Sequence, residues 1–490
     1  MWWFGKSKPK STGNSQVQKV AIRAFYDAEK TTSENKNHWQ YVNSLTADEV
    51  NSSGVRQTLR NRSRYERENN TYAKGLAKTL ANYTMGTGPR LQLLWDDADL
   101  ADAVEKRFMQ WAKTVKLSQK LITLKMAKAT DGEAFCQIIT NNRIKDMVKL
   151  DIIPIECDWV NGANYGFLAD DNVDGVKIDE YGNPIAYQVE QSDSLGLKAS
   201  IWKTVDANFM CHWFNADRPG QHRGIPEFTP ALPLFAYLRR YTLATIGAAE
   251  IAAAQSLYLE TPANDVDGDT ESEAEAAPFS EVALQRNTLS ILPTGTKPFQ
   301  LKAEQPVTAY NDFKHEIINE IARCLNVPYN VAAGNSSSYN YASGRLDHQD
   351  FWLNIGVERV SCEENVLDKI FYEWYQEAIL ISDYLPRGAE MYDPADHKYF
   401  WPGPEHVDPT KEANANSTEY EMKSTTLAEI YGKKGQDWRK QMQQYYAEKA
   451  EMLAMEKALS DKFGTTIDPN PGKKIIEEEK DEAEKPRDAE

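Results

Sequence analysis

A neutral stretch between Cys324 and Gly344 is the feature that most constrains how this chain can fold. None of its residues is charged, although Asp, Glu, Lys and Arg make up 26% of the chain. It follows an apolar stripe with four-residue spacing and precedes a helical pattern from Arg345 onward, so it is predicted to be a loop between two helices. Pro328 ends the first helix, because it lacks a backbone N–H and disfavours helical angles at the preceding residue. A long polar loop on rigid helices is typical of a functional site, and a mobile surface loop is the alternative.

Length and charge limit the classes of protein to which this chain can belong. Its 490 residues should form two or more domains or subdomains. The formal charge of −17 argues against nucleic-acid binding by broad phosphate neutralisation, because that requires a basic surface. Weak, sliding contact with nucleic acid remains compatible with this charge.

The cysteines and the apolar segments indicate an intracellular protein without a membrane partner. The five cysteines are odd in number, widely scattered and set among apolar residues, so they are expected to be reduced, buried thiols. The N-terminal residues contain too short an apolar run for a signal peptide. The most apolar segment, residues 232–259, is interrupted by Arg239, Arg240 and Glu250, so no spanning helix is expected.

Hydrophobic periodicity divides the chain into helices around a small, mainly antiparallel β region. The long helix at 229–259 is rich in alanine, which suits packing beside copies of itself or in the core of one subunit. The helix at 344–382 contains Gly356 as a possible bend. The predicted segments are helices at 60–83, 98–115 and 118–129, short strands at 133–214, the helix at 229–259, an acidic exposed loop at 262–278, a short helix before the neutral stretch, the helix at 344–382 and helical residues at 415–463.

Several enzyme motifs nearly occur, and each lacks a residue that its chemistry requires. The HExxH-like run that starts at His315 has Asn319 in place of the second histidine. Residues 170–181 resemble a calcium loop, but Tyr181 stands where the bidentate glutamate belongs, so an Asp-Gly hairpin is expected. The glycines at 86–88 lack the third glycine of a dinucleotide loop, and no Walker or GxSxG motif occurs. No catalytic residue, metal or cofactor is predicted, and the protein is not expected to be an enzyme.

Five arginines lie close together just before and within the start of the first predicted helix. They could contact phosphate groups or the carboxylates of a neighbouring subunit, and a solvated helix face is the alternative. Glu66 and Glu68 lie among them and weaken the phosphate interpretation. The five are Arg56, Arg60, Arg62, Arg64 and Arg67.

Five blocks, taken in order, resemble the lambda-type family of tailed-phage portal proteins, and the resemblance covers about residues 50–450. The late block has two parts, and no single block is as specific as a metal motif. The blocks are RNRSRYERENNTYAKGLAKTLANYTMGTG at 60–88, DGVKIDEYGNPIAYQV at 174–189, HRGIPEFTPAL at 222–232, YASGRLDHQDFW at 341–352, and FWPGPEHVDPTKEANA at 400–415 with TLAEIYGKKGQDW at 426–438.

Members of this family form a ring, usually of twelve identical subunits, at one vertex of the phage head. The resemblance implies a helix-rich α+β subunit with an α/β wing, a two-helix stem, a small clip and a helical crown. The implied parts are a polar N-terminal arm (1–45), the wing (46–228), the first stem helix (229–259), the clip (260–306), the second stem helix (307–326), the channel loop (327–344), a long helix with the wing return (345–404), the crown (405–463) and a disordered acidic tail (464–490).

The function that the resemblance implies is passage of double-stranded DNA into the head during packaging and out of it during ejection, with a separate ATPase as the energy source. The implied partners are further copies of the chain, the terminase large subunit, a head-tail adaptor or connector protein, the major capsid and scaffolding proteins, and double-stranded DNA bound without sequence specificity. The protein would assemble in the host cytoplasm and reside at the portal vertex of the virion. The alternatives are a phage structural protein with hydrolase or protease activity, and a capsid adaptor that does not contact DNA.

The neutral stretch has a physical role in such a channel. Each lysine or arginine that pairs with a phosphate adds affinity that would hold the duplex, so an uncharged loop lets DNA slide. Packing of Tyr339 and Tyr341 against their own helices is an equal alternative to DNA contact. The loop residues that could touch DNA are Asn335, Ser336, Ser337, Ser338, Tyr339, Asn340 and Tyr341.

Overall fold

The fold is described from a computed structural model of the whole chain. The predicted acidic loop at 262–278 and tail at 464–490 lie outside the described residues, as do the predicted arm except Leu45 and most of the predicted clip. The structure describes residues 45–162, 172–192, 198–254, 258–260, 297–299, 307–337, 339–403, 409–434, 436 and 438–463.

Five helices form the N-terminal part of the described chain, and their ends follow local capping rules. Asn70 ends α2 and caps α3, because its side-chain oxygen accepts hydrogen bonds from the backbone N–H groups of Tyr72 and Ala73. Gly132 ends α5 in a left-handed conformation with φ +90°, and a Cβ there would lie 2.2 Å from the carbonyl carbon of Ile225. The helices are α1 (Ala47–Val50), α2 (Ser53–Asn69), α3 (Thr71–Met85), α4 (Ala98–Thr114) and α5 (Leu117–Asp131).

The predicted antiparallel β region is confirmed. Two sheets, with strand orders β3-β2-β8 and β4-β5-β6-β7, cover residues 133–214. The predicted Asp-Gly hairpin is also confirmed: Asp174 and Gly175 join β4 to β5 with φ values of +46° and +89°, as a type I′ turn requires. The strands are β2 (Glu133–Thr140), β3 (Leu150–Ile155), β4 (Asn172–Val173), β5 (Val176–Ile178), β6 (Pro184–Ser192), β7 (Lys198–Asp206) and β8 (Met210–Phe214).

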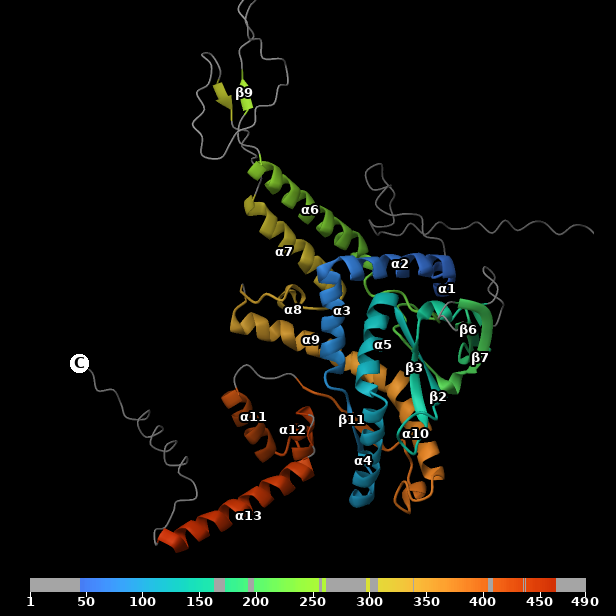
Figure 1. Ribbon diagram of the computed structural model, residues 1–490, viewed down its shortest axis with the longest axis vertical. Helices are drawn as coiled ribbons and strands as arrows, with labels where there is room; N and C mark the ends of the chain where they lie inside the picture. Colours follow the sequence, from blue (N-terminus) through green and yellow to red (C-terminus); the bar gives the residue numbers. More distant parts are fainter. Residues whose placement is uncertain are drawn as a thin grey trace, which may run out of the picture.

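Two long helices lie side by side and project from this body (Figure 1). The first, α6 (Leu232–Ala254), follows a short 3-10 turn at Thr229–Ala231, so the helix expected at 229–259 is present with a shorter C-terminal end. The second, α7 (Val307–Cys324), packs against it, and the rings of Tyr241 and Tyr310 stack with centroids 5.6 Å apart. Beyond them β9 (Tyr258–Glu260) pairs with β10 (Lys297–Phe299) in antiparallel fashion.

The long helix expected at 344–382 is present, and it differs from the prediction in its start and in the place of its irregularity. It begins earlier, as α9 (Tyr341–Cys362), and continues through a π-helical turn at Glu363–Leu367 into α10 (Asp368–Leu380). The helix is irregular at this turn and not at Gly356, where the bend was predicted. Gly356 is an ordinary helical position, and a Cβ added there would have no atom within 4 Å. The turn packs under Trp401, whose indole N–H donates to Glu363 Oε1 over 2.5 Å, and such local contacts stabilise the extra residue.

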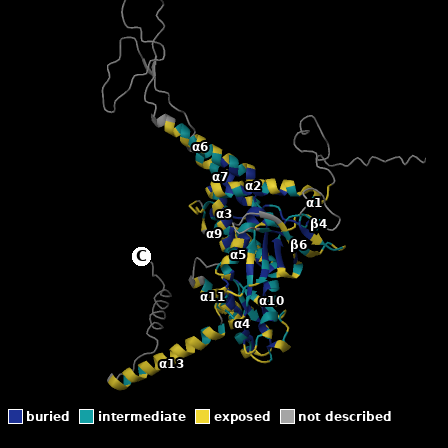
Figure 2. Cartoon of the chain, turned by 45° about the vertical axis from the view of Figure 1, so that its right-hand side comes forward, coloured by how far each residue is buried: buried dark blue, intermediate teal, exposed yellow. Residues whose placement is uncertain are grey.

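The chain after α10 returns to the body through one strand and then continues into three helices, of which the last is largely exposed. Strand β11 (His397–Phe400) pairs with β1 (Arg90–Leu93), so two segments far apart in the sequence meet in one ribbon. Figure 2 shows that α13, the last helix, is exposed along most of its length. The final helices are α11 (Pro409–Glu421), α12 (Leu427–Lys433) and α13 (Trp438–Phe463).

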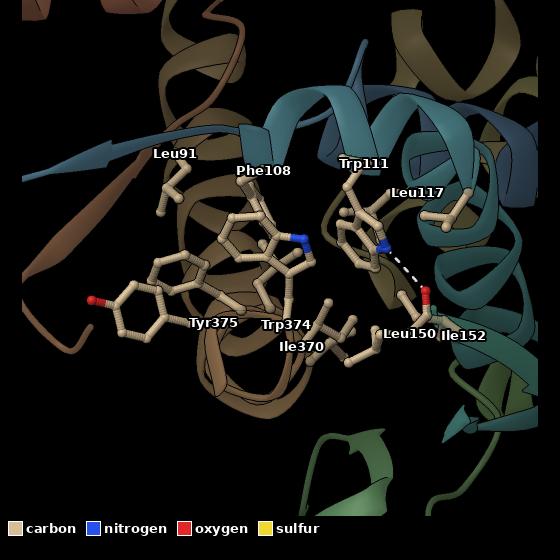
Figure 3. Close-up of a cluster of buried hydrophobic side chains, with 14 of the residues drawn as sticks. Leu91, Phe108, Trp111, Leu117, Leu150, Ile152, Ile370, Trp374 and Tyr375 are labelled. Carbon is tan, nitrogen blue, oxygen red and sulfur yellow. Dashed lines mark hydrogen bonds between the residues drawn. The ribbon is translucent and has the colours of Figure 1, made fainter. Parts of the chain in front are cut away.

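An aromatic core joins α4, α10 and the three-stranded sheet (Figure 3). Phe108 packs edge-on against Trp374 with ring centroids 5.1 Å apart. The indole N–H of Trp111 donates to the Leu150 carbonyl over 2.9 Å, which ties α4 to the sheet. A second core, between α3, α6, α7 and α9, contains Phe351 and Ile355 and fixes the base of the projecting helices.

Candidate functional site

The candidate site is the neutral stretch between α7 and α9, and its first turn is fixed by a helix cap. Helix α7 ends because Asn326 adopts a left-handed conformation with φ +51°. The N–H of Val327 then donates to the Ala322 carbonyl over 3.0 Å, which satisfies a carbonyl at the helix end. Asparagine tolerates this conformation better than most residues, so the local sequence determines where α7 stops.

The stretch is not one continuous loop, as residues 327–344 were predicted to be. A short helix, α8 (Tyr329–Ala333), follows Pro328, whose fixed φ of −63° suits the position before a helix. Gly334 ends α8 with φ +63°, and the irregular tip is therefore limited to residues 334–340. Pro328 before α8 and Gly334 after it are start and stop signals for this short helix. The five residues between them are too few to show a recognisable hydrophobic period, so the helix was not predicted.

The tip is held by its own polar side chains. Asn335 and Ser337 are exposed, and Asn335 Oδ1 accepts a hydrogen bond from the Ser337 backbone N–H over 3.0 Å. Asn340 caps α9 by accepting from the Ser343 backbone N–H over 2.9 Å. Ser336 is exposed as well, whereas Ser338 and the side chain of Tyr341 lie outside the described residues. DNA contact by the tip stays a prediction.

Tyr339 packs against its own helix. It is half-buried, and its Cδ1 lies 3.6 Å from the position that a Cβ on Gly344 would occupy. Burial, and then the hydrogen bond to Asp347, raise the pKa of Tyr339. Of the two interpretations of this tyrosine, packing on α9 agrees with the structure.

Two histidines hold α8 in place. The ring of His315 on α7 lies against the ring of Tyr329, with centroids 3.9 Å apart. The buried Asn330 places its Nδ2 3.4 Å from Nε2 of His348 on α9. These contacts connect α8 to both flanking helices, so the tip projects from a supported base.

A buried ion cluster fastens α9 and the start of α6 to α5. Lys125 and Lys128 of α5 are 1% and 0% exposed. Lys125 Nζ lies 2.8 Å from Glu358 of α9, and Lys128 Nζ lies 2.8 Å from Glu227, which precedes α6. Burial alone would raise the pKa of Glu358, but attraction by Lys125 and Lys128 outweighs it and lowers that pKa to about 2.

This cluster predicts an acid-sensitive contribution to stability. The folded pKa of Glu358 is lower than its ordinary value of 4.5, so the stabilisation is present above that value and lost as the pH falls toward 2. The loss is on the order of 3 kcal/mol, at 1.36 kcal/mol per pKa unit. We expect Glu358→Gln to destabilise the protein near neutral pH and to weaken the acid dependence of unfolding by urea, followed by fluorescence. Glu364→Gln, at an exposed position of the π turn, is the control, and equal acid dependence in wild type and Glu358→Gln would contradict the assignment.

The structure places three of the five predicted arginines inside the subunit. Arg56 and Arg60 are 2% and 3% exposed, so a solvated helix face is wrong for both. Arg56 pairs with Asp174, and Arg60 lies 3.0 Å from Glu133. Arg64 forms two hydrogen bonds of 2.8 Å with Asp131, and it also pairs with Glu156 and Asp158. Their charges are neutralised by carboxylates of the same chain, which corrects the expectation that these three contact phosphate or another subunit.

The other two arginines are not committed in this way. Arg62 is exposed, and Arg67 is half-buried with its Nη2 3.9 Å from Met126 Sδ. Intersubunit or phosphate contact therefore stays a prediction for Arg62 and Arg67 alone.

The centre of this buried network is a glutamate that no sequence pattern indicated. Glu133 is 0% exposed and accepts hydrogen bonds from Arg223 Nη2 over 2.6 Å and from the Gly224 N–H over 3.0 Å. Nε2 of His212 lies 3.1 Å from Oε2, the oxygen that also accepts from Gly224. The HRG triplet that contains Arg223 was visible in the sequence, but its partner lies 90 residues away.

Two further kinds of site do not occur in the described part of the chain. None of its helices has the combined length and hydropathy to pass through a lipid bilayer. Across the same residues, no three His, Cys, Asp or Glu side chains converge so that they could hold a metal ion.

Comparison with known proteins relates most of the chain to one family. The family described as "Phage portal protein, lambda family" matches residues 32–359. The probable portal protein of Halomonas phage phiHAP-1 is 25% identical over 415 residues, which are 78% of this chain and 78% of that protein.

Solved structures give weaker similarities. A chain from the virion of a native gene transfer agent particle has a TM-score of 0.43 and 11% identity, with coverage of 78% of this chain and 93% of that chain. An HK97 family phage portal protein from Corynebacterium diphtheriae has a TM-score of 0.26 and 14% identity, with coverage of 61% and 83%. TM-scores this low do not assign any element of this chain.

Proposed function

The chain belongs to the lambda family of phage portal proteins, and from this premise we propose that it forms a ring whose channel conducts double-stranded DNA during packaging and ejection. The observation that supports this function is the uncharged tip at residues 334–340, held at the free end of α9 beside α7. Figure 1 shows α8 and the start of α9 on the side of the subunit away from β6 and β7. A tip with no cation there can line a channel without pairing with phosphate.

Helix α7 supports the same function through its exposed face. Asp312, Glu316 and Glu320 recur at four-residue spacing and are all exposed. A row of carboxylates repels DNA phosphate, so a channel lined by α7 and the neutral tip would hold the duplex loosely. Arg323, also exposed, is one turn further along the helix and is the single cation on this face of α7 in the described chain.

Ring assembly is supported by an unpartnered apolar face on α9, which we call the α9 stripe. Its members are spaced by seven, four and three residues, which places them on one side of the helix. The opposite side of α9 packs against α3 through Phe351 and Ile355, each 2% exposed. The α9 stripe consists of Leu346, Leu353, Val357 and Val360, which are 65%, 70%, 64% and 50% exposed. Contiguous exposed apolar side chains of this size indicate a protein interface.

A second exposed face has complementary character, as a closed ring requires. On this α2–α6 face the guanidinium of Arg239 lies 4.9 Å from the centre of the Tyr65 ring, which joins α2 to α6. The face is apolar with Arg62 as its unpaired exposed cation among the described residues, since Arg239 pairs with Glu66. Asp350 and Glu364 are exposed along the α9 stripe. The α2–α6 face consists of Arg62, Tyr65, Arg239, Leu243 and Ile246.

The two faces belong to different helices, because the stripe lies on α9 and the other face on α2 and α6. We propose that one subunit uses its α9 stripe against the α2–α6 face of the next, which gives a head-to-tail ring.

Family membership supports the remaining assignments. We assign α6 and α7 to the stem, residues 334–340 to the channel loop, α11–α13 to the crown, and the helices and sheets of residues 46–228 with the return at 345–403 to the wing. The β9–β10 end would be the clip that docks the terminase and later the head-tail connector proteins. Twelve subunits are expected, in the portal vertex of the virion.

The channel function is tested by removing the tip. In phage that carries glycines at residues 335–339, with the Asn340 cap kept, we expect rings and heads to assemble but most of the packaged DNA to be lost, because the duplex loses its polar guide. Packaged DNA is measured as nuclease-protected genome per head. Tyr181→Gly, in an exposed turn and 81% exposed, is the control.

Two results would argue against this function. Normal packaging with the glycine tip would favour an adaptor that does not contact DNA. A purified protein that stays monomeric under all assembly conditions would argue against a portal ring.

A further inference from the structure

An open cleft of about 560 Å³ lies between α4 and the turn that follows α10, and we call it the α4 cleft. Its charged lining consists of Lys106, Arg107 and Arg387, with Asp383 as the single carboxylate. All three cations are exposed. In a chain with a formal charge of −17, such a concentration of positive charge needs an explanation.

The cations of the α4 cleft are not paired with carboxylates in the described part of the chain, and one of them, Arg107, is held in place. Lys106, Arg107 and Arg387 take part in none of the ion pairs found among the described residues. The Arg107 guanidinium lies 5.3 Å from the centre of the Tyr384 ring, which is buried. Tyr384 in turn donates its hydroxyl hydrogen bond to Asp146 over 2.9 Å. This support orients Arg107 and leaves its charge available to a ligand.

More cations continue the positive surface beyond the cleft. Lys113 is exposed and lies seven residues after Lys106, so both occupy one face of α4, about 10 Å apart at 1.5 Å per residue. Arg143 and Lys145 are exposed in the β2–β3 turn beside Asp146. Cations spaced in this way along a surface suit successive phosphates better than a single small anion.

We propose that the α4 cleft binds the phosphate backbone of double-stranded DNA outside the channel. The proposal rests on the proposed portal function, because it uses the orientation of the subunit. The α4 cleft is lined by α4 and the turn after α10, and Figure 1 shows these elements at the opposite end from β9. If β9 and β10 are the clip outside the head, the cleft faces the interior, where packaged DNA is the main polyanion.

The lining of the cleft favours DNA over an acidic protein segment. Protein interfaces depend on a buried apolar core with aromatic anchors. The uncharged residues of the α4 cleft are Ala103, Gln110, Tyr384, Leu385 and Pro386, and the one aromatic ring is already buried under Arg107. Cations from two elements without an apolar core are typical of phosphate contacts, which position DNA without reading its sequence.

Binding at one cleft would be weak, and the ring would strengthen it. Each phosphate contact contributes about 0.9 to the slope of log affinity against log salt, so one cleft accounts for a slope of about 3. Identical clefts around a ring act on one duplex together, which raises the overall affinity. Because the clefts lie apart from the channel, this affinity would not slow the passage of DNA through it.

The test uses assembled rings and a covalently closed duplex minicircle, which has no end and cannot thread the channel. The variant K106Q/R107Q/R387Q removes the three cations of the cleft. The control K74Q/K78Q/K423Q removes three other exposed lysines, so its net charge is the same. We expect wild-type and control rings to bind the minicircle, and the cleft variant to lose about tenfold or more in affinity with a smaller salt slope. Binding is measured by fluorescence anisotropy at several salt concentrations.

Three results would overturn the proposal. The first is equal minicircle affinity of the cleft variant and wild type. The second is wild-type rings that bind poly-glutamate but not the minicircle, which would indicate an acidic protein partner. The third is a cleft variant that fails to form rings although its monomer unfolds normally, which would make the cleft a subunit contact. Failure of the wild type to form any ring would instead count against the portal function itself.

Discussion

Replacement of Glu133 by alanine is expected to lower the free energy of unfolding by about 3 to 5 kcal/mol, because it removes the most deeply buried carboxylate that two buried cations share. Glu133 and Arg223 are both 0% exposed, and Arg60 is 3% exposed. The two guanidinium groups share the Glu133 side chain at 3.0 and 2.6 Å. Water cannot replace the lost oxygens at such depth, so the penalty falls on the folded state. Glu133→Gln keeps the shape and removes the charge, and we expect a similarly large effect.

The acid dependence of this network has a definite sign. Burial alone would raise the pKa of Glu133, but attraction by Arg223 and the hydrogen bond from His212 hold it well below its ordinary value of 4.5. The stabilisation is therefore present above that value and lost as the pH falls through the folded pKa. We expect Glu133→Ala to be much less stable than wild type near neutral pH, and the difference to shrink in strong acid.

Unfolding by urea, followed by tryptophan fluorescence, measures the effect. The control is Glu68→Ala, because Glu68 is exposed on α2 and should change the stability by less than about 0.5 kcal/mol. If Glu133→Ala unfolded at the same urea concentration as Glu68→Ala, the network would contribute orientation but no net stability.

Local patterns predicted the elements well because they depend on neighbouring residues. The helix-rich α+β class, the antiparallel strands at 133–214 and the Asp-Gly hairpin all follow from periodicity and turn chemistry. The π turn at Glu363–Leu367 does not, because it depends on packing under Trp401 and not on local propensity. A bend was predicted at Gly356 only because glycine weakens a helix.

The arginines of α2 show why long-range contacts could not be predicted. Arg56, Arg60 and Arg64 were grouped by position in the sequence, and that group contains Arg62, which is exposed. The carboxylates that bind Arg56, Arg60 and Arg64, and so distinguish them from Arg62, lie 67 to 118 residues further along the chain. Since these carboxylates lie on or near the sheets and α5, the sequence of α2 alone cannot show which of its arginines are buried and which are solvated. The same holds for the α4 cleft, whose cations come from segments about 280 residues apart.

The placement of charge has a consistent logic for a DNA channel. Buried cations of α2 and α5 are neutralised inside the subunit by Glu133, Glu227 and Glu358. The exposed face of α7 is acidic, and the tip is uncharged. The cations of the α4 cleft lie apart from this proposed route, on which Arg323 of α7 and Arg345 of α9 are also exposed. The largest group of phosphate contacts would then occur at the cleft and not in the channel.

Introducing carboxylates into the α9 stripe is expected to abolish the ring. Leu353 and Val357 are 70% and 64% exposed in the subunit, so Leu353→Asp/Val357→Asp should leave its own fold intact. Burial of each apolar side chain contributes about 1.5 to 3 kcal/mol, and the new carboxylates add a desolvation cost at every interface. Leu380→Asp, at a residue that is 83% exposed outside the stripe, is the control and should still form rings. Assembly is measured by the mass of the particle in solution and by electron microscopy.

The head-to-tail arrangement gives this prediction a stricter form. Tyr65→Asp/Leu243→Asp damages the α2–α6 face and should also prevent rings on its own. An equimolar mixture with the Leu353→Asp/Val357→Asp variant then retains one intact pair of faces, since each subunit supplies the face that the other lacks. We expect the mixture to form dimers and nothing larger, because the second contact of every dimer is damaged. Rings from the mixture, or from either variant alone, would show that the subunits associate through other surfaces, whereas monomers alone would show that these two faces do not meet.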